Sequence, residues 1–416
     1  MVDSLKTEDI VHPQCQFLVE RKKRLCRMLV RPGQNYCCEH EPQNKQKQED
    51  TRVPCPYDPK HTCYASKLKK HLSICNARQT EQPAYIVHNI NSPLDDAGGG
   101  EGETRRSLGE VPREELLRVI DKINYLYEKH VAGHIEALPE RPVHAAVAAE
   151  FADAGRAEGS RRHLRQASAL LHLVEQHGLV QPGTCYVELG AGKGRLAYYA
   201  GVAWCGGAGG GGAGGGAGSR VLPVDRAALR HKRDNKLAGA ATRLRADLAH
   251  LALERVPAVE ASRHVVGFAK HLCGVATDFA LRCVAAPGAL AKTRGVVLAT
   301  CCHHRCERAP FVGTPHLQEL GVSAEELRVM LGVVSWATSG AGAGAGAAGA
   351  EAGRRAKALL DWARARWLAG RGFAARLLRF VPDAVSPENV CIVATRPRPR
   401  PARGREGANE TLSMQI

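Results

Sequence analysis

The stretch YVELGAGKGR, residues 186–195, decides the fold of this 416-residue chain. An apolar strand runs into an acidic residue, Glu188, and then into a turn with three glycines, Gly190, Gly192 and Gly194. A helix-forming stretch follows the turn. This order brings backbone N–H groups to a helix N-terminus, where an anion or a nucleotide can approach closely. The stretch therefore predicts a strand, turn and helix that bind a nucleotide or nucleoside.

Strand-like and helix-like segments alternate from Thr184 onward, which predicts a parallel sheet with helices on both faces. The last two strand-like segments are separated by PDAVSPE and predict a terminal hairpin. The fold class is therefore α/β, with a Rossmann-like sheet of seven mostly parallel strands. The expected strands are 184–189, 220–225, 241–248, 264–272, 295–300, 374–380 and 389–395.

Two amphipathic helices lead into this sheet. The first covers 113–130 and the second 160–178, and spacing places an apolar stripe on each. The expected inward residues are Leu116, Leu117, Ile120, Ile123 and Leu126 in the first helix, and Leu164, Leu170, Leu171 and Val174 in the second.

Three segments are too poor in apolar residues to form part of a core. Residues 80–112 contain Pro83, Pro93 and a glycine run, and predict a linker. The glycine- and alanine-rich segments 206–218 and 339–353 predict flexible surface loops inserted into the sheet domain.

Two acidic residues extend the nucleoside site. Asp225 ends the second strand, 35 residues after Gly190, and the spacing is 22 without the 13-residue insert. An acidic residue about 20 positions on holds ribose hydroxyls in nucleoside folds. Asp247 ends the third strand, where it could meet an adenine amino group or be an exposed loop carboxylate. Glu188 would repel a pyrophosphate but could accept hydrogen bonds from an ammonium group, so we expect S-adenosylmethionine rather than a nicotinamide cofactor.

Cysteines and histidines cluster before residue 80, in a region with little apolar content. Seven of the 15 cysteines lie between Cys15 and Cys75. Four N/S ligands close a tetrahedral structural zinc site, and a core this small usually needs a metal to fold. We expect two structural zinc ions, in a knot over 12–42 and a second over 52–79. The expected ligands are Cys15, Cys26, Cys37 (or its neighbour Cys38) and His40, then Cys55, His61, His71 and Cys75.

Titratable residues follow two of the expected strands. KHLCGVATD brings Lys270, His271, Cys273 and Asp278 to the C-terminal end of the fourth strand, and ATCCHHRCE brings Cys301–His304 to that of the fifth. Ligands bind at this rim of a doubly wound sheet, and such groups suggest proton handling. The CCHH segment could instead hold a metal, supply a cysteine nucleophile or only hydrogen-bond nearby loops. Adjacent residues point different ways, which argues against one ion bound by all four.

Charge and hydropathy limit the partners. The formal net charge is +16, which favours a polyanion such as a nucleic acid. Basic residues 21–27 and Lys67, Lys69 and Lys70 flank the knots and could contact phosphates or be solvated. The basic tail, 396–416, is expected to be disordered. No apolar run reaches the ~18 residues of a membrane helix and no secretory signal is evident, so we expect an intracellular protein, in the cytoplasm or nucleus.

The two knots, YVELGAGKG, KHLCGVATD, ATCCHHRC and SPENV occur in an order that resembles the Trm-thirteen family of tRNA ribose methyltransferases. The resemblance implies a CCCH-type knot, a CHHC-type knot and a Rossmann-like class I methyltransferase domain, here 113–395. It also implies transfer of a methyl group from S-adenosylmethionine to the 2′-hydroxyl of nucleotide 4 in the tRNA acceptor stem. The two inserts and the tail depart from the family pattern.

Carried over by motif, Glu188, Gly190, Gly192 and Gly194 resemble the donor-binding turn. Lys270, His271 and Asp278 are candidates for taking the hydroxyl proton, and His303 and His304 for positioning the substrate. Two alternatives stay open: methylation of another RNA or of a protein, and a non-catalytic zinc-containing RNA-binding protein. The sequence sets no oligomeric state.

Overall fold

The structure is a computed structural model, and it divides into two compact units, Met1–Glu81 and Gln82–Ile416. It describes residues 13–20, 23–31, 33–37, 40, 51–75, 77, 82–92, 107–139, 141–206, 218–229, 232–237, 239–339 and 346–396. Among these, no helix is both long and apolar enough to span a membrane.

The first unit contains two small antiparallel pairs of strands. Strands β1 (Leu18–Val19) and β2 (Arg24–Leu25) pair beside the first cysteine cluster. Strands β3 (Arg52–Cys55) and β4 (Asp58–Tyr64) pair in the second, followed by the short η2 (Ala65–Lys67) and α1 (Leu68–Ile74). Apart from its cysteines, the buried apolar content around β1 and β2 is Val30, so side-chain packing contributes little there.

The second unit is built on one mixed sheet with the order β5-β11-β12-β10-β9-β6-β7-β8. Strands β10, β9, β6, β7 and β8 run parallel, whereas β12 is antiparallel to both β10 and β11. The strands are β5 (Ile135–Ala137), β6 (Thr184–Leu189), β7 (Arg220–Asp225), β8 (Leu244–Arg245), β9 (His264–Cys273), β10 (Thr293–Cys301), β11 (Ala374–Arg379) and β12 (Val390–Thr395).

The expected terminal hairpin is confirmed by the pairing of β11 with β12. The expected count of seven strands is wrong, because β5 adds an eighth strand parallel to β11. This three-residue strand is too short to show an alternating pattern. The third expected strand, 241–248, is reduced to Leu244–Arg245, because Asp247 already caps the following turn.

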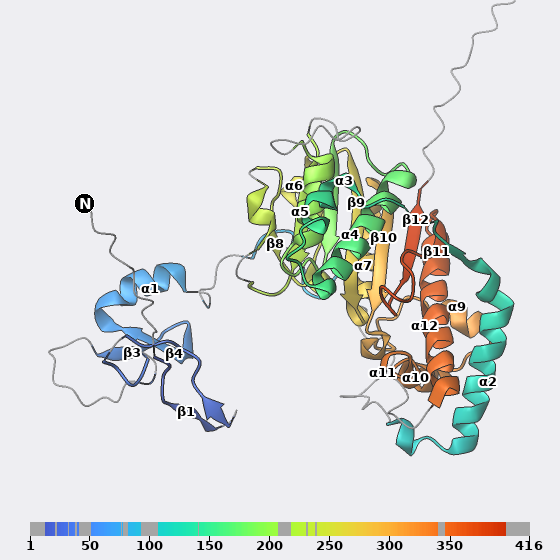
Figure 1. The fold of residues 1–416 in the computed structure, drawn as a ribbon, viewed down its shortest axis with the longest axis horizontal. Helices are drawn as coiled ribbons and strands as arrows, with labels where there is room; N and C mark the ends of the chain where they lie inside the picture. Colours follow the sequence, from blue (N-terminus) through green and yellow to red (C-terminus); the bar gives the residue numbers. More distant parts are fainter. Residues whose placement is uncertain are drawn as a thin grey trace, which may run out of the picture. The chain divides into compact units, whose positions relative to one another are not determined.

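Helices cover both faces of the sheet and form two cores. On one face α3, α4 and α5 pack on Tyr186, Phe268 and Val297, and Figure 1 shows them grouped together in green. On the other face α2, α7, α10 and α12 pack on Val187, Val296 and Ile392. These helices are α2 (Arg113–His130), α3 (Ala145–Phe151), α4 (Glu158–Gln176), α5 (Arg195–Trp204), α7 (Val275–Ala285), α10 (Ala324–Val333) and α12 (Gly346–Ala369).

Both expected lead-in helices are present as α2 and α4. All four residues expected to face inward in α4 are buried. In α2 the buried residues are Val119, Ile123 and Leu126, whereas Leu117 is 50% exposed. Leu116 and Ile120 are partly buried and also pack on the core, so the expected stripe is confirmed except for Leu117, and Val119 joins it.

The second insert is partly helical, which corrects the expectation of a loop over 339–353. Residues 346–353 form the first turns of α12, with Gly349, Ala352 and Gly353 buried. Alanine has the highest helix propensity, and small residues let α12 approach α11 (Trp336–Ser339) closely. A Cβ on Gly353 would lie 2.5 Å from the Ala337 nitrogen. Residues 207–217, 340–345 and 397–416, which include most of the first insert and the tail, lie outside the described residues.

Part of the expected linker, 80–112, packs on the sheet domain. Ile86 bridges to Leu251, and the buried Asn91 side chain donates hydrogen bonds to the carbonyls of Leu248 and Leu251 at 2.7 and 2.8 Å. Val111 is also buried. Residues 93–106 lie outside the described part of the chain, so the linker expectation stays a prediction only there.

Candidate active site and zinc knots

The turn between β6 and α5 has the backbone conformation that its glycines predict. Gly190, Gly192 and Gly194 all have positive φ, at 71°, 51° and 67°. A Cβ on Gly194 would collide with Asp234 at 2.2 Å, and one on Gly190 would lie 3.0 Å from Leu272. A Cβ on Gly192 would meet no atom within 4 Å. The loop is therefore packed against protein at its two ends and open at its centre.

Glu188 lies buried beneath this loop. Its Oε2 accepts a hydrogen bond from the backbone N–H of Ala197, in the first turn of α5, at 2.8 Å. Burial raises the pKa of Glu188 to about 8, and the positive charges of Arg243 and Lys270 partly oppose that rise. The carboxyl group thus lies between the glycine loop (190–194), α5 and Lys270.

Asp225, at the end of β7, holds the glycine turn in place. Its Oδ2 accepts from the N–H of Gly192 at 2.7 Å, and its Oδ1 accepts from the N–H of Ala227 at 2.8 Å. Asp247 caps the turn after β8, where its side chain accepts from the N–H of Ala249 at 3.0 Å. Both carboxylates therefore lie at the expected rim of the sheet and fix local backbone there.

A buried ion pair supports the same loop and was not predicted. Arg243 donates two hydrogen bonds to Asp234, at 2.9 and 2.8 Å, and Asp234 is 3% exposed. The pair fills the space that the missing side chain of Gly194 leaves. Both residues lie in a polar stretch after the first insert, where periodicity gave no sign of burial.

Lys270 and His271, at the end of β9, contact α4. Lys270 Nζ donates to Nδ1 of His163 at 3.2 Å and to Oε1 of Gln166 at 3.3 Å. The same Gln166 oxygen accepts from Nε2 of His271 at 3.1 Å. Burial lowers the pKa of Lys270 to about 8 and that of His271 to about 4. At neutral pH His271 is therefore uncharged, and Lys270 titrates close to neutrality.

His163 and Gln166 belong to this cluster and were not predicted. His163 is exposed and Gln166 is 4% exposed, so the cluster extends from the core to solvent. Burial and the charge of Lys270 lower the pKa of His163, which keeps its imidazole neutral so that Nδ1 can accept a hydrogen bond from Lys270. The sequence signal was a histidine and a glutamine three positions apart on the amphipathic helix α4.

Asp278, which was expected to be an accessible base, is buried away from solvent. It is fully buried in α7, where Arg364 of α12 contacts both its oxygens at 3.1 and 2.6 Å. The N–H of Val312 donates to it at 3.2 Å. Because both carboxylate oxygens are engaged in the core, the geometry does not favour Asp278 as an accessible base.

His303 lies in the same buried network. Its Nε2 is 3.0 Å from Oδ2 of Asp361, which also accepts from Thr300 at 2.6 Å and pairs with Arg364 through its other oxygen at 2.9 Å. Burial would raise the pKa of Asp361, but His303 and Arg364 hold it well below its usual range. The sequence signal for this network was an acidic and a basic residue, Asp361 and Arg364, three positions apart on an apolar face of α12.

A cavity of about 510 Å³ opens beside His303 and Thr300. The SPENV segment contributes Pro387, Glu388 and Asn389 to its wall, and α12 contributes Lys357. No residue of the glycine loop, 190–194, lines it. The two titratable rims therefore face different elements: Lys270 and His271 face α4, whereas His303 faces α12. His304 is partly exposed beside His303.

Three cysteines lie together at the ends of β9 and β10, between the Lys270–His271 cluster and the His303 network. Cys273 Sγ lies 3.2 Å from Cys301 Sγ, and the Sγ of Cys302 is in the same group. Hydrogen bonding from Cys301 lowers the pKa of Cys273 to about 6. Sequence analysis placed these residues at one rim but did not predict that they would come together.

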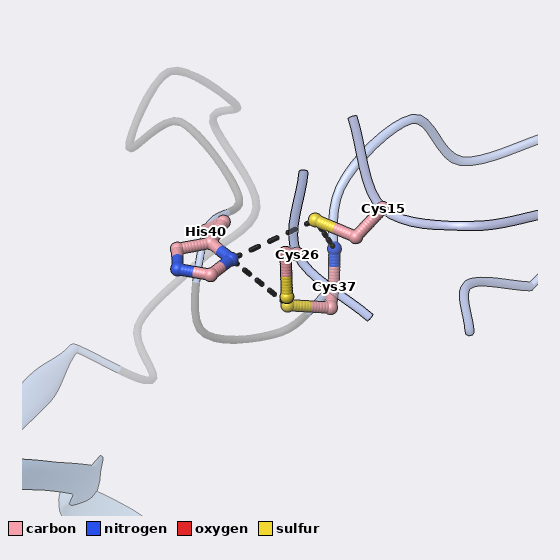
Figure 2. A group of neighbouring side chains, drawn as sticks. All are labelled: Cys15, Cys26, Cys37 and His40. Carbon is pink, nitrogen blue, oxygen red and sulfur yellow. Dashed lines mark hydrogen bonds between the residues drawn. The ribbon is translucent and has the colours of Figure 1, made fainter. Parts of the chain in front are cut away.

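The first zinc knot brings its four expected ligands together (Figure 2). His40 Nδ1 lies 3.6 Å from Cys15 Sγ and 3.3 Å from Cys37 Sγ, and the Cys37 N–H lies 3.3 Å from Cys15 Sγ. Cys26 completes the set, and all three cysteines are buried. Three thiolates and one imidazole suit tetrahedral zinc. Cys38, the alternative to Cys37, lies outside the described residues.

The second knot also gathers its expected ligands. Cys55 Sγ is 3.6 Å from Cys75 Sγ, and the Nε2 atoms of His61 and His71 are 3.1 Å apart. His71 lies on α1 and Cys75 is its C-cap, so the expected helical spacing holds. Asp58 Oδ2 lies 3.6 Å from the other ring nitrogen of His61. A carboxylate there orients a metal-binding histidine.

Comparisons with known proteins agree with this arrangement. Residues 165–395 match the family described as Methyltransferase TRM13. Residues 13–41 match the CCCH zinc finger in TRM13 protein, and 52–76 match the U11-48K-like CHHC zinc finger. These matches support zinc in both knots.

Curated relatives are similar over most of the chain. A Mus musculus protein named tRNA:m(4)X modification enzyme TRM13 homolog is 31% identical, over 79% of this chain and 74% of the relative. The Homo sapiens homolog is 30% identical with the same coverage. The Eremothecium gossypii enzyme is 30% identical over 94% of this chain and 96% of its own length. A solved cyclopropane-fatty-acyl-phospholipid synthase-like protein from Lactobacillus casei has a TM-score of 0.23 over 36% of the chain, at 18% identity, and supports no argument.

The family match runs from within α4 to β12, which leaves out β5, and includes the glycine loop, Lys270 and the cysteine cluster. Both zinc-finger matches enclose the ligand sets that the structure brings together. The chain therefore belongs to the TRM13 methyltransferase family.

Proposed function

We propose that this protein transfers a methyl group from S-adenosylmethionine to the ribose 2′-hydroxyl of nucleotide 4 in the tRNA acceptor stem, on a Rossmann-like class I methyltransferase domain. The membership in the TRM13 family and the printed names of its relatives, tRNA:m(4)X modification enzymes, support the substrate. The observation that carries the site is the open glycine loop beside a lysine with a lowered pKa.

The residues around the loop fit S-adenosylmethionine. The loop is open at Gly192, which is the one position of its three glycines where a Cβ would meet nothing. Asp225 lies at the end of β7, where it can exchange backbone partners for ribose hydroxyls. Glu188 can accept from the ammonium group in its charged form. When bound, this cofactor supplies an electrophilic methyl group on a sulfonium.

Lys270 is the best candidate for taking the hydroxyl proton. A sugar hydroxyl is a poor nucleophile at neutral pH, and a general base works best when its pKa is near the operating pH. Burial lowers the pKa of Lys270 to about 8, whereas His271, at about 4, is a weak base. Gln166 and His163 hold the ammonium group in place. Both oxygens of Asp278 contact Arg364, so we favour Lys270 over Asp278 as the base.

Basic residues near this cluster suit a phosphate backbone. Arg162 and Arg195 are exposed, and the charge of each lowers the pKa of His163, so both lie close to it. Lys193, between Gly192 and Gly194 in the glycine loop, is also exposed. Positive side chains of this kind position a nucleic acid without reading its sequence. We propose that they orient the acceptor stem over the tips of β6 and β9.

The zinc knots are proposed to add affinity for tRNA. Lys67, Lys69 and Lys70 are exposed beside α1 on the metal-stiffened CHHC knot. They can contact phosphates away from the reaction centre. We also propose that the protein works inside the cell, in the cytoplasm or nucleus, where tRNA is made; a fluorescent fusion of the full chain tests this.

Methylation of unmodified tRNA with labelled donor tests the proposal. The expected product is a 2′-O-methylated nucleoside that maps to position 4. Label in a base, at another position, or only in protein would favour the alternative of a methyltransferase with another substrate. Absence of donor binding by calorimetry, with and without tRNA, would favour a non-catalytic RNA-binding protein.

A further inference from the structure

The thiols of Cys273, Cys301 and Cys302 lie together where β9 and β10 end. The proposed reaction does not use them. Cys273 is the last residue of β9 and Cys301 the last of β10, and their Sγ atoms are 3.2 Å apart. The Sγ of Cys302 lies within 4.8 Å of both. Cys301 is buried, whereas Cys273 and Cys302 are partly exposed. The group therefore lies at the border of core and solvent.

A β-bulge at His271 brings Cys273 opposite Cys301. In β10, Ala299 pairs with Lys270 but the next residue, Thr300, pairs with Leu272. His271 is thus the extra residue, and it has a positive φ of 64°. Side chains alternate along a strand, so regular pairing of this sequence would put Leu272 opposite Cys301 and direct Cys273 to the opposite face.

A second strained residue turns Cys302 toward the same point. Neighbouring side chains in an extended strand point to opposite faces, but Cys302 has a φ of 49°. This left-handed conformation costs about 1 kcal/mol or more for a residue with a side chain. Both strained non-glycine residues of the sheet rims, His271 and Cys302, therefore serve to gather thiols.

The two loops that carry the thiols are locked together. The N–H of Gly274 donates to the carbonyl of Cys301 at 3.1 Å. A Cβ on Gly274 would lie 2.5 Å from Cβ of Arg305 and 2.7 Å from its backbone. The close approach of the loops after β9 and β10 thus requires glycine, and it fixes the separation of the sulfur atoms.

We propose that Cys273, Cys301 and Cys302 bind a third zinc ion, separate from the two knots. Thiolates are preferred ligands of Zn²⁺. The Sγ separations are comparable with those within the CHHC knot, where Cys55 and Cys75 are 3.6 Å apart. Within the described residues, no fourth Cys, His, Asp or Glu atom joins the group. Three protein ligands leave one coordination position for water, as in zinc sites that bind exogenous groups.

A disulfide is the competing fate of these thiols, because Cys273 and Cys301 are paired residues of neighbouring strands. It would use two of the three sulfur atoms and leave no role for the strained Cys302. Zinc uses all three, which is why we favour the metal.

Metal analysis of the full chain, purified with a phosphine reductant after growth in zinc, tests the site. The expected wild-type content is one zinc ion more than the two that the knots hold. Cys273→Ser and Cys302→Ser are each expected to lose one equivalent, and Cys205→Ser, a partly exposed cysteine outside the group, to lose none. Two equivalents in the wild type, with the three thiols free, would overturn the proposal, and so would a Cys273–Cys301 disulfide in the peptide map of protein purified without reductant.

Cobalt substitution separates loss of the site from misfolding. Co²⁺ bound here should add charge-transfer absorption from three thiolates beyond that of the knots. Cys302→Ser should remove this added absorption and keep a cooperative unfolding transition, because Cys302 lies at the rim and loss of its thiol leaves the core intact. Equal cobalt spectra for the wild type and Cys302→Ser would contradict the assignment. Neither readout depends on methyl transfer, so failure of the proposed function leaves this test intact.

Discussion

The side-chain oxygen of Gln166 lies 3.3 Å from Nζ of Lys270, and the residues are 104 positions apart in the chain. The contact joins α4 to the end of β9 and holds Lys270 at the rim where we propose that the ribose hydroxyl meets the methyl donor. The same oxygen accepts from His271 at 3.1 Å. One buried amide thus positions both titratable residues of this rim.

Turnover is expected to rise with pH, with a midpoint near 8, because only uncharged Lys270 can accept a proton and burial lowers its pKa to about 8. Lys270→Ala should lower kcat by about 10²–10⁴-fold, the usual contribution of a general base. The measurement is a pH–rate profile at saturating donor and tRNA. Gln166→Leu removes the accepted hydrogen bond and should shift the midpoint, whereas Lys129→Ala, an exposed lysine on α2, should leave the profile unchanged. A flat profile from pH 6 to 9 would assign the proton to another group.

Donor binding is expected to release a proton from Glu188 at pH 7. The pKa of this buried carboxyl is raised to about 8, so at pH 7 it is mostly protonated. A cationic ammonium group nearby favours the carboxylate and lowers that pKa. Calorimetry in buffers of different ionisation enthalpy measures the released proton. Glu188→Gln should bind the donor more weakly and release none. Equal proton release by both proteins would show that Glu188 does not meet the ammonium group.

Asp278→Asn is expected to act on stability rather than on proton transfer. Asp278 and Arg364 form a fully buried pair, and removal of one partner from such a pair costs about 3–5 kcal/mol. Denaturant unfolding measures the loss. Lys270→Ala, beside solvent-exposed His163, serves as the contrast, with little change in unfolding free energy and a large change in kcat. A stable but inactive Asp278→Asn protein would return Asp278 to the list of catalytic candidates.

Gly353→Ala is expected to destabilise the protein although it improves helix propensity. The added Cβ would lie 2.5 Å from the Ala337 nitrogen and 3.0 Å from the Val333 oxygen, which are backbone atoms that cannot rotate away. Overpacking of this kind costs about 1–3 kcal/mol. Gly159→Ala, in α4 with open space around it, is the matched control and should be neutral or stabilising. Similar unfolding midpoints for both variants would contradict the close approach of α11 and α12.

Local signals allowed three features to be predicted: the glycine loop (190–194), most strands, and the Cys/His sets of both knots. Alternating apolar residues, three glycines at fixed spacing and Cys/His spacings each reflect backbone geometry within a few residues. The helical start of α12 was missed because a run of glycine and alanine has no periodicity, and its packing depends on α11.

The composition of the active site could be predicted only in part, because its contacts join distant segments. His163 meets Lys270 across 107 positions, and Asp278 meets Arg364 across 86. No local pattern marks such a partner. The meeting of Cys273 with Cys301 depends on a one-residue bulge at His271, and a change in register of this kind leaves no trace in hydrophobic periodicity.

Methyl acceptance by tRNA transcripts with a single 2′-deoxy substitution tests the central claim most directly. The account predicts that deoxy substitution at nucleotide 4 abolishes methyl transfer, whereas the same substitution at nucleotide 3 or 5 leaves most of it. Undiminished transfer to the transcript with deoxyribose at nucleotide 4 would contradict the account.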